Sequence, residues 1–290
     1  MDEVGVRELL RSGVTLARKR IDAQRSQVAG TIAVDDTIAA VLDRLTQLAV
    51  VLADHDKRDL WNESIGALLE IFRLGVPANE ELGSVRTFEA EYLMAAIQRV
   101  FALGGFLIRR GKYEYARTLI SQTPNHNYPK YYWIRYAVTM ISRGEIAQFK
   151  KSLIAPSSEF VRSKPELFAL FDENLDATVN AMCQFDFMQC VVASHETSSV
   201  FQAYPNFGAF WNYRTTPIVR SMLPGGAARS ALTDISDAEL ANILRAVDQS
   251  TAHNFFNFSG WSSNNWGDKS IEGFLAAHPP TASNPFSADM

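Results

Sequence analysis

The sequence predicts an all-α fold in which helical hairpins form two lobes with extended N- and C-terminal arms. Apolar residues recur at steps of three and four, the period of an amphipathic helix, and no series of alternating strands competes with it. A hydrophobic content of 47% with 21% charged residues is typical of a globular core. The 290 residues divide into a basic N-terminal arm or helix (1–34), a helical lobe with basic aromatic hairpins (35–164), an acidic helical lobe (165–254) and an aromatic C-terminal tail rich in Asn, Ser, Gly and Pro (255–290).

The N-terminal segment, residues 7–30, is compatible with a helix but has only a thin apolar stripe. Arg18, Lys19, Arg20 and Arg25 surround that stripe. Such a segment is either an arm that docks on another subunit or a ligand, or an amphipathic first helix.

Three helices are predicted over residues 35–54, 58–74 and 87–109, and Asp35 or Asp36 caps the first. In the third helix, Gly104 and Gly105 each cost about 1 kcal/mol against alanine, so we expect a close helix approach or a break there. The apolar stripes of these helices are Ile38, Val41, Leu42, Leu45, Leu48 and Leu52, then Leu60, Ile65, Leu68, Leu69 and Phe72, then Tyr92, Ile97, Val100 and Phe101.

Residues 103–120, "LGGFLIRRGKYEYARTLI", contain a set of residues with a recognisable spacing: Leu103 and Gly104 in a first helix, Gly111 and Tyr113 at a turn, and Ala116 in a second helix. This stretch resembles one tetratricopeptide repeat. Gly144 follows 33 residues after Gly111, and Trp133 stands where the repeat has its first-helix Trp, close to the family's 34-residue period. The resemblance covers about residues 97–153 and implies stacked helix pairs there.

The C-terminal half is predicted to contain the most buried helices, over residues 166–196, which are dense in Phe, Met, Leu and Val. Prolines and a glycine pair predict irregular structure over 204–229. A helix follows over 236–247, where Ser236 and Glu239 form a capping box. The aromatic side chains of the tail are expected to be pinned against the body or a neighbouring subunit.

Charge is unevenly distributed along the chain. Residues 86–164 contain 13 Lys and Arg against 5 Asp and Glu, a net charge of +8, whereas residues 165–290 contain 5 basic and 13 acidic residues, a net charge of −8. The first segment can therefore present a cationic face to a polyanion. Alternatively, the two segments pack together and largely neutralise each other.

Residues 128–136, "YPKYYWIRY", put five aromatic rings and two cations into nine residues. One aromatic face of a helix here fills the core, or else the rings offer a stacking surface beside the cations. Base stacking on aromatic rings contributes about 1–3 kcal/mol per base, and basic side chains add the salt-dependent phosphate contribution. The residues predicted to bind nucleic acid are Arg109, Arg110, Lys112, Arg117, Lys130, Tyr131, Arg135, Arg143, Lys150 and Lys151.

Known catalytic and metal motifs do not fit the sequence. The stretch 105–113 is one residue too long for a phosphate-binding loop, and Tyr113 replaces the hydroxyl that would hold magnesium. His195 and Glu196 could belong to a zinc-binding helix, but position 199 is serine where that motif needs its second histidine. His195 is therefore interpreted as a helix-end residue bonded to backbone. Cys183 and Cys190 are interpreted as buried thiols in a reducing compartment. We expect no cofactor, no metal and no enzymatic activity.

Two functions from different classes remain. The first is a self-assembling protein that binds single-stranded RNA in a basic aromatic groove, in the manner of nucleoproteins and coat proteins, with terminal arms that contact other copies. The second is a tetratricopeptide-like adaptor that binds an acidic peptide or protein. Because no signal peptide or spanning segment is found, we expect an intracellular, cytoplasmic protein, in a virion if viral, without membrane contact.

Overall fold

The computed structural model describes residues 2–26, 35–74, 87–122, 175–197, 212–253 and 268–280. The secondary-structure elements in these ranges are helices, and none of the described residues forms a strand, so the predicted all-α fold is confirmed. The helices are α1 (Glu3–Ser26), α2 (Asp36–Asp54), α3 (Arg58–Leu74), α4 (Thr87–Arg109), α5 (Tyr113–Ser121), α9 (Leu175–Thr197), α10 (Asn212–Met222), the 3-10 helix η4 (Ala227–Leu232), α11 (Asp237–His253) and α12 (Lys269–Ala277).

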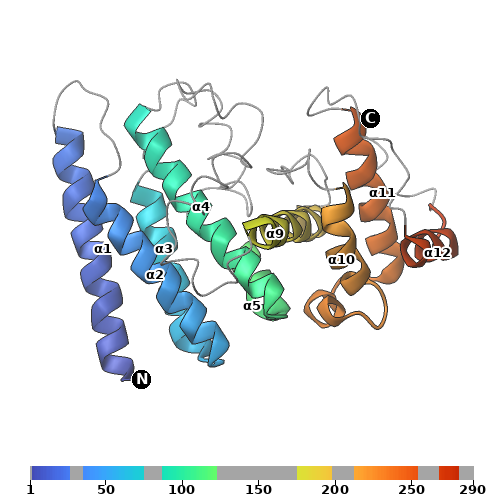
Figure 1. Cartoon of the computed structure of the whole chain (residues 1–290), viewed down its shortest axis with the longest axis horizontal. Coiled ribbons are helices and arrows are strands. Elements are labelled where there is room, and N and C mark those ends of the chain that lie inside the picture. The colour runs from blue at the N-terminus through green and yellow to red at the C-terminus, as the bar shows by residue number, and fades with distance from the viewer. Residues whose placement is uncertain are drawn as a thin grey trace.

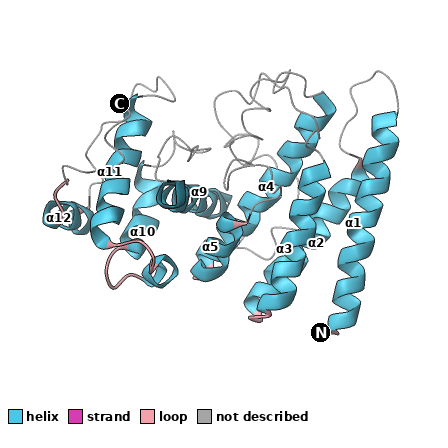
Figure 2. Cartoon of the chain, turned by 180° about the vertical axis from the view of Figure 1, so that it is seen from behind, coloured by secondary structure: helices cyan, strands magenta, loops and turns pink. Residues whose placement is uncertain are grey.

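The described helices form an elongated assembly. Helices α1 to α5 lie side by side at one end, α9 lies between the two ends, and α10, α11 and α12 form the other end (Figures 1 and 2). Helix α9 packs against α4, α5, α10 and α11. One continuous cluster of buried apolar side chains runs through both ends. The division at residue 164 into two lobes stays a prediction.

The N-terminal segment is a packed helix. Helix α1 contacts α2 and α3, and it buries Val6, Leu10, Ala17 and Ile21. Its other faces are exposed and carry charged residues together with Val4, Leu9 and Leu16. Of the two alternatives that the sequence left open, a docking arm or an amphipathic first helix, the structure shows an amphipathic first helix.

The predicted helices of residues 35–109 are confirmed almost residue for residue. Asp35 caps α2 by accepting a hydrogen bond from the Thr37 backbone N–H at 2.6 Å. The predicted stripes of α2 and α3 are buried, with Leu48 partly so. A second link between helices was not predicted: the Arg99 Nε of α4 donates to Asp43 Oδ1 of α2 at 2.8 Å, and the Arg99 side chain is only 3% exposed.

Two consecutive hairpins, α2–α3 and α4–α5, have equivalent turns. The Lys57 N–H donates to the Leu52 carbonyl at 2.9 Å, and the Lys112 N–H donates to the Leu107 carbonyl at 2.8 Å. The residue before each lysine, Asp56 or Gly111, has a positive φ, 52° or 66°. Such a bond across the end of a helix is the Schellman arrangement.

The second hairpin follows the first by 55 residues (112 − 57), and at this offset several residues are identical. The identical pairs are Ala40 and Ala95, Arg44 and Arg99, Leu48 and Leu103, Leu52 and Leu107, Lys57 and Lys112, and Ile65 and Ile120. The α4–α5 hairpin that resembles a tetratricopeptide repeat therefore has a structural counterpart upstream. The counterpart expected downstream, with Trp133 and Gly144, lies outside the described residues.

The glycine pair in α4 marks a close helix approach, one of the two expected outcomes. A Cβ on Gly104 would lie 2.3 Å from the Phe185 ring, and one on Gly105 would lie 3.1 Å from Met182 of α9. Helix α4 continues without a break through both glycines. Gly104 has no room for a Cβ, and a Cβ on Gly105 would be tighter than ordinary contact, because α9 lies directly against the α4 backbone.

The C-terminal half confirms one expectation and corrects another. Helix α9 is almost wholly buried between residues 178 and 194, as its composition predicted. The expectation of irregular structure over 204–229 is wrong in its second half, where α10 continues through Pro217 and η4 follows. Ile218, Val219 and Met222 are buried, and this burial offsets the hydrogen bond that proline removes. Residues 269–277 form α12, a helix that the composition of the tail did not predict.

Candidate functional site

The structure describes four of the residues predicted to bind nucleic acid: Arg109, Arg110, Lys112 and Arg117. The others, Lys130, Tyr131, Arg135, Arg143, Lys150 and Lys151, lie outside the described residues, as does the aromatic stretch 128–136. The four described cations lie within nine residues of sequence, yet their surroundings differ strongly.

Arg109 and Arg110 are exposed at the C-terminal end of α4. The guanidinium carbon of Arg110 lies 5.2 Å from the centroid of the Phe106 ring, a distance suited to a cation–π contact. Arginine at this end of a helix also interacts favourably with the helix dipole. Both side chains are therefore held on the surface of the protein, at the point where the chain turns towards α5.

Lys112 is part of a contact between the two equivalent turns. Its ammonium donates to Asp56 Oδ1 at 2.9 Å, and this hydrogen bond holds the pKa of the exposed Asp56 carboxyl below its ordinary value. Lys112 and Arg58 also lie 6.0 and 5.5 Å from the centroid of the Tyr115 ring, and burial is the main cause of the raised pKa of that phenol. The charge of Lys112 is thus shared with a carboxylate from the preceding hairpin.

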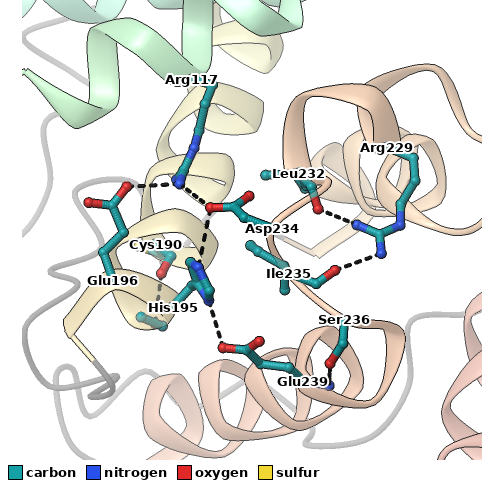
Figure 3. A network of polar contacts seen from close by, with 11 residues as sticks. Arg117, Cys190, His195, Glu196, Arg229, Leu232, Asp234, Ile235, Ser236 and Glu239 are labelled. Carbon is teal, nitrogen blue, oxygen red and sulfur yellow. Dashed lines mark hydrogen bonds and ion pairs between the residues drawn. The ribbon is translucent and has the colours of Figure 1, made fainter.

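Arg117 is the most enclosed of the four cations, with a side chain that is 15% exposed. Its Nη2 lies 2.8 Å from Glu196 Oε1 at the end of α9 and 2.9 Å from Asp234 Oδ2, which precedes α11 (Figure 3). Here the basic segment and the acidic C-terminal half neutralise each other directly. For Arg117, the alternative in which the basic and acidic segments pack together and neutralise each other is therefore correct.

His195 continues this network, and the expectation that it bonds to backbone is wrong. Its Nδ1 lies 2.6 Å from Glu239 Oε1 and its Nε2 lies 3.2 Å from Asp234 Oδ2 (Figure 3). Both contacts are N–H donations only when both ring nitrogens carry a proton. The capping box is half formed: Ser236 Oγ accepts from the Glu239 N–H at 3.2 Å, while the Glu239 side chain is used for His195.

The ion pairs and hydrogen bonds of Arg117, His195, Glu196, Asp234 and Glu239 connect α5, α9 and the start of α11. We call this network the clamp. Two candidate nucleophiles on α9 are otherwise engaged or inert. Ser194 donates its hydroxyl proton to the Cys190 carbonyl at 2.7 Å, and burial raises the pKa of the Cys190 thiol well above its ordinary value. A thiol held in its protonated form is a poor nucleophile.

No group of three or more His, Cys, Asp or Glu side chains among the described residues is arranged to hold a metal ion. None of the described helices is both long enough and apolar enough to cross a membrane. Neither Cys183 nor Cys190 forms a disulfide, and both side chains are buried, as the sequence predicted.

A groove of about 450 Å³ lies between α1 and α3. Ion pairs cross it at two levels: Arg7 Nε lies 3.0 Å from Glu63 Oε1, and Arg18 Nη2 lies 2.6 Å from Glu70 Oε1. Gly66 lines the groove in the middle of α3, where a Cβ would meet nothing within 4 Å. Glycine inside a helix costs about 0.5–1 kcal/mol relative to alanine, and packing within the described chain gives no reason for it at this position.

The network partners of Arg117 and His195 could not be recognised in the sequence, because they lie 39 to 117 residues away along the chain. The acidic partners stand out only as part of the net charge of the C-terminal half. No family model matches the chain, and no curated protein or solved structure shows significant similarity to it.

Proposed function

We propose that the chain is a non-enzymatic, self-assembling all-α protein that binds single-stranded RNA through its basic segment, residues 86–164, in the manner of nucleoproteins and coat proteins. The observation that carries the proposal is the exposed pair Arg109 and Arg110 at the end of α4, within a segment of net charge +8. Neighbouring exposed arginines supply phosphate contacts without the desolvation that buried ones require. The binding surface then continues into residues 128–151, and the protein works inside the cell.

The described contacts narrow the set of residues that would meet RNA. Arg117 already has two carboxylate partners, so it serves the clamp between helices. Lys112 shares its charge with Asp56. In the described part the proposal rests on Arg109 and Arg110 because both are exposed. Beyond it, the proposal rests on Lys130, Tyr131, Arg135, Arg143, Lys150 and Lys151.

The test measures binding of a fluorescein-labelled 20-nucleotide oligouridylate by anisotropy over a range of salt concentrations. Arg109→Glu with Arg110→Glu should weaken binding by at least about tenfold and flatten the slope of log K against log salt by about 0.7 for each phosphate that the variant no longer neutralises. The matched control is Arg73→Glu with Lys269→Glu, which makes the same charge change at two exposed positions outside the segment. Lys130→Glu with Arg135→Glu extends the test to residues beyond the described part.

Two results would count against the proposal. A wild-type protein that does not retain the oligouridylate at low salt would exclude RNA binding by this surface. Equal losses in the Arg109/Arg110 variant and in the control variant would show that only overall charge matters, because long-range electrostatics then explains the binding without a local site.

The tetratricopeptide-like adaptor is the second candidate, and the repeated hairpin favours it. Helices α2–α3 and α4–α5 have equivalent turns and stack through α2 and α4, as hairpins do in helical repeat proteins. Arg110, Lys130 and Arg135 would then bind an acidic partner. A labelled peptide of alternating Glu and Ala distinguishes the candidates: an adaptor binds it more tightly than oligouridylate, whereas an RNA-binding protein does the reverse.

A further inference from the structure

One face of α1 beside the α1–α3 groove is exposed, and two of its residues, Arg11 and Thr15, line the groove. Glu8 and Arg11 are exposed on α1, and neither side chain forms an ion pair or hydrogen bond with any described residue. Val4, on the same helix, is 63% exposed, the highest value among the large apolar side chains described. Together with Thr15 these residues are spaced by three and four, so they share one face of α1. We call this face the outer stripe: Val4, Glu8, Arg11 and Thr15.

The outer stripe is complementary to itself. If two α1 helices pack in antiparallel orientation about a two-fold axis near residues 9 and 10, Glu8 of each faces Arg11 of the other, and Val4 faces Thr15. A two-fold interface uses the same patch on both copies, so one favourable charge pair is formed twice. The α1 helix of each copy would then cover the groove of the other. Because Gly66 has no side chain, it leaves space in the groove for that second helix.

The charges of the groove select against a polyanion. Arg7 and Arg18 are already paired with Glu63 and Glu70, and both glutamates line the groove. Among the cations that line the groove, only Arg11 has no partner among the described residues. The groove can therefore pair with a single carboxylate. A run of phosphates would meet Glu63 and Glu70 without compensation.

We propose that the outer stripe and the α1–α3 groove form a homodimer interface, in which α1 of each copy packs antiparallel against the other and Glu8 pairs with Arg11 of the second copy. This inference rests on the self-assembly in the proposed function, and it places one contact of that assembly on α1. The partner is a second copy of this chain, and RNA takes no part in the contact.

A charge swap tests the interface. The full-length protein is treated with nuclease, and its mass is measured by sedimentation equilibrium against the monomer mass of 32.3 kDa. Glu8→Arg alone and Arg11→Glu alone should each raise the dimer dissociation constant by at least about tenfold, because each puts like charges together twice. The double variant Glu8→Arg with Arg11→Glu restores both pairs and should return the constant to within about threefold of the wild type.

Three further variants locate the contact. Arg44→Glu makes the same charge change as Arg11→Glu at an exposed residue of α2 beside the other face of α1, and it should leave the dimer unchanged. Gly66→Gln places a side chain in the groove and should weaken the dimer while the helical circular dichroism is retained. Leu16→Asp probes a different exposed face of α1, where Leu16 is 42% exposed, and it should also leave the dimer unchanged.

The proposal is overturned by a nuclease-treated wild type that stays monomeric, by a charge swap that fails to restore the dimer, or by a dimer that Leu16→Asp disperses and Arg11→Glu does not. Oligouridylate binding is measured on the same variants. A wild type that binds oligouridylate but stays monomeric after nuclease treatment overturns the interface alone, and a wild type that dimerises but does not bind oligouridylate overturns RNA binding alone. In the single variants Glu8→Arg and Arg11→Glu the dimer should weaken while RNA affinity is retained, because the oligouridylate site uses Arg109 and Arg110 instead of α1.

Discussion

Two pairs of arginines in one stretch of the chain have opposite surroundings. Arg99 and Arg117 are enclosed and paired with carboxylates of other helices, while Arg109 and Arg110 are exposed at the end of α4. All four count equally in the net charge of +8 for residues 86–164. Net charge therefore overstates the number of cations that a segment can present to a ligand, because some of those cations form ion pairs that stabilise the fold.

The largest effect on stability is expected at Arg99. Arg99→Met removes the arginine that pairs with the Asp43 carboxylate between α2 and α4, and it should lower the free energy of unfolding by about 3–5 kcal/mol. Urea unfolding followed by circular dichroism measures the change. The double variant Asp43→Leu with Arg99→Met should recover most of the loss, because it removes both charges of the buried pair. A loss below about 1 kcal/mol for the single variant would contradict this role.

Arg117 should matter less, because its partners are partly exposed. Arg117→Met deprives Glu196 and Asp234 of this cation, and we expect a loss of about 1–3 kcal/mol in unfolding free energy. Arg117→Lys should be intermediate, since a single ammonium matches two carboxylates less well than a planar guanidinium. If both variants were as stable as the wild type, the clamp between α5, α9 and α11 would have no energetic role.

The ion pair of Arg220 and Asp268 differs from those of Arg99 and Arg117, because here the arginine is exposed and the carboxylate is enclosed. Its contribution to stability can be tested by lowering the pH. Arg220 Nε lies 2.9 Å from Asp268 Oδ2, and this hydrogen bond is the main cause of the lowered pKa of Asp268, which also caps α12. A carboxyl with a lowered folded-state pKa contributes stability above its unfolded value, near 3.9, and loses it as the pH falls through the folded value. Stability should therefore fall more steeply below about pH 4 in the wild type than in Asp268→Asn.

The measurement for Asp268 is chemical unfolding at a series of pH values between about 6 and 2. The difference between the wild type and Asp268→Asn isolates this carboxyl, because the other acidic groups are common to both proteins. A difference that stays constant over this range would show that Asp268 does not change its affinity for protons on folding.

The smallest effect on stability is expected at the exposed pair. Arg109→Glu with Arg110→Glu should change the free energy of unfolding by no more than about 0.5 kcal/mol per residue, as is usual for surface substitutions. Urea unfolding of the double variant beside Arg117→Met makes the comparison direct. A large loss would place these arginines among the structural ones and remove the main support for an RNA-binding surface.

Local sequence patterns predicted much of the fold. The period of three and four located α2, α3 and α4, and α2 and α3 each bury one continuous apolar stripe. Asp35 was recognisable as a helix cap. Helix α10 was missed because Pro217 normally ends a helix, and only the burial of its neighbours shows why it does not. Helix α12 was not predicted, because it lies in a tail rich in Asn, Ser, Gly and Pro, residues that seldom occur within helices.

The candidate sites were harder to predict, for a physical reason. A row of cations in the sequence does not indicate which of them meets a carboxylate from another helix, and the partners of Arg117 come from α9 and from the start of α11. The equivalence of the α2–α3 and α4–α5 hairpins was also missed. It rests on the hydrogen bonds and backbone angles of two turns, and few of the aligned residues are identical.

The most direct test of RNA binding and assembly is the absorbance and size of the full-length protein purified at low salt, before and after nuclease treatment and a high-salt wash. If the protein assembles on RNA, the 260/280 nm absorbance ratio should be well above that of bare protein, in particles much larger than the 32.3 kDa monomer that shrink once the RNA is digested. A bare-protein spectrum at monomer or dimer size, unchanged by nuclease, would contradict this assembly and return the search to a protein partner.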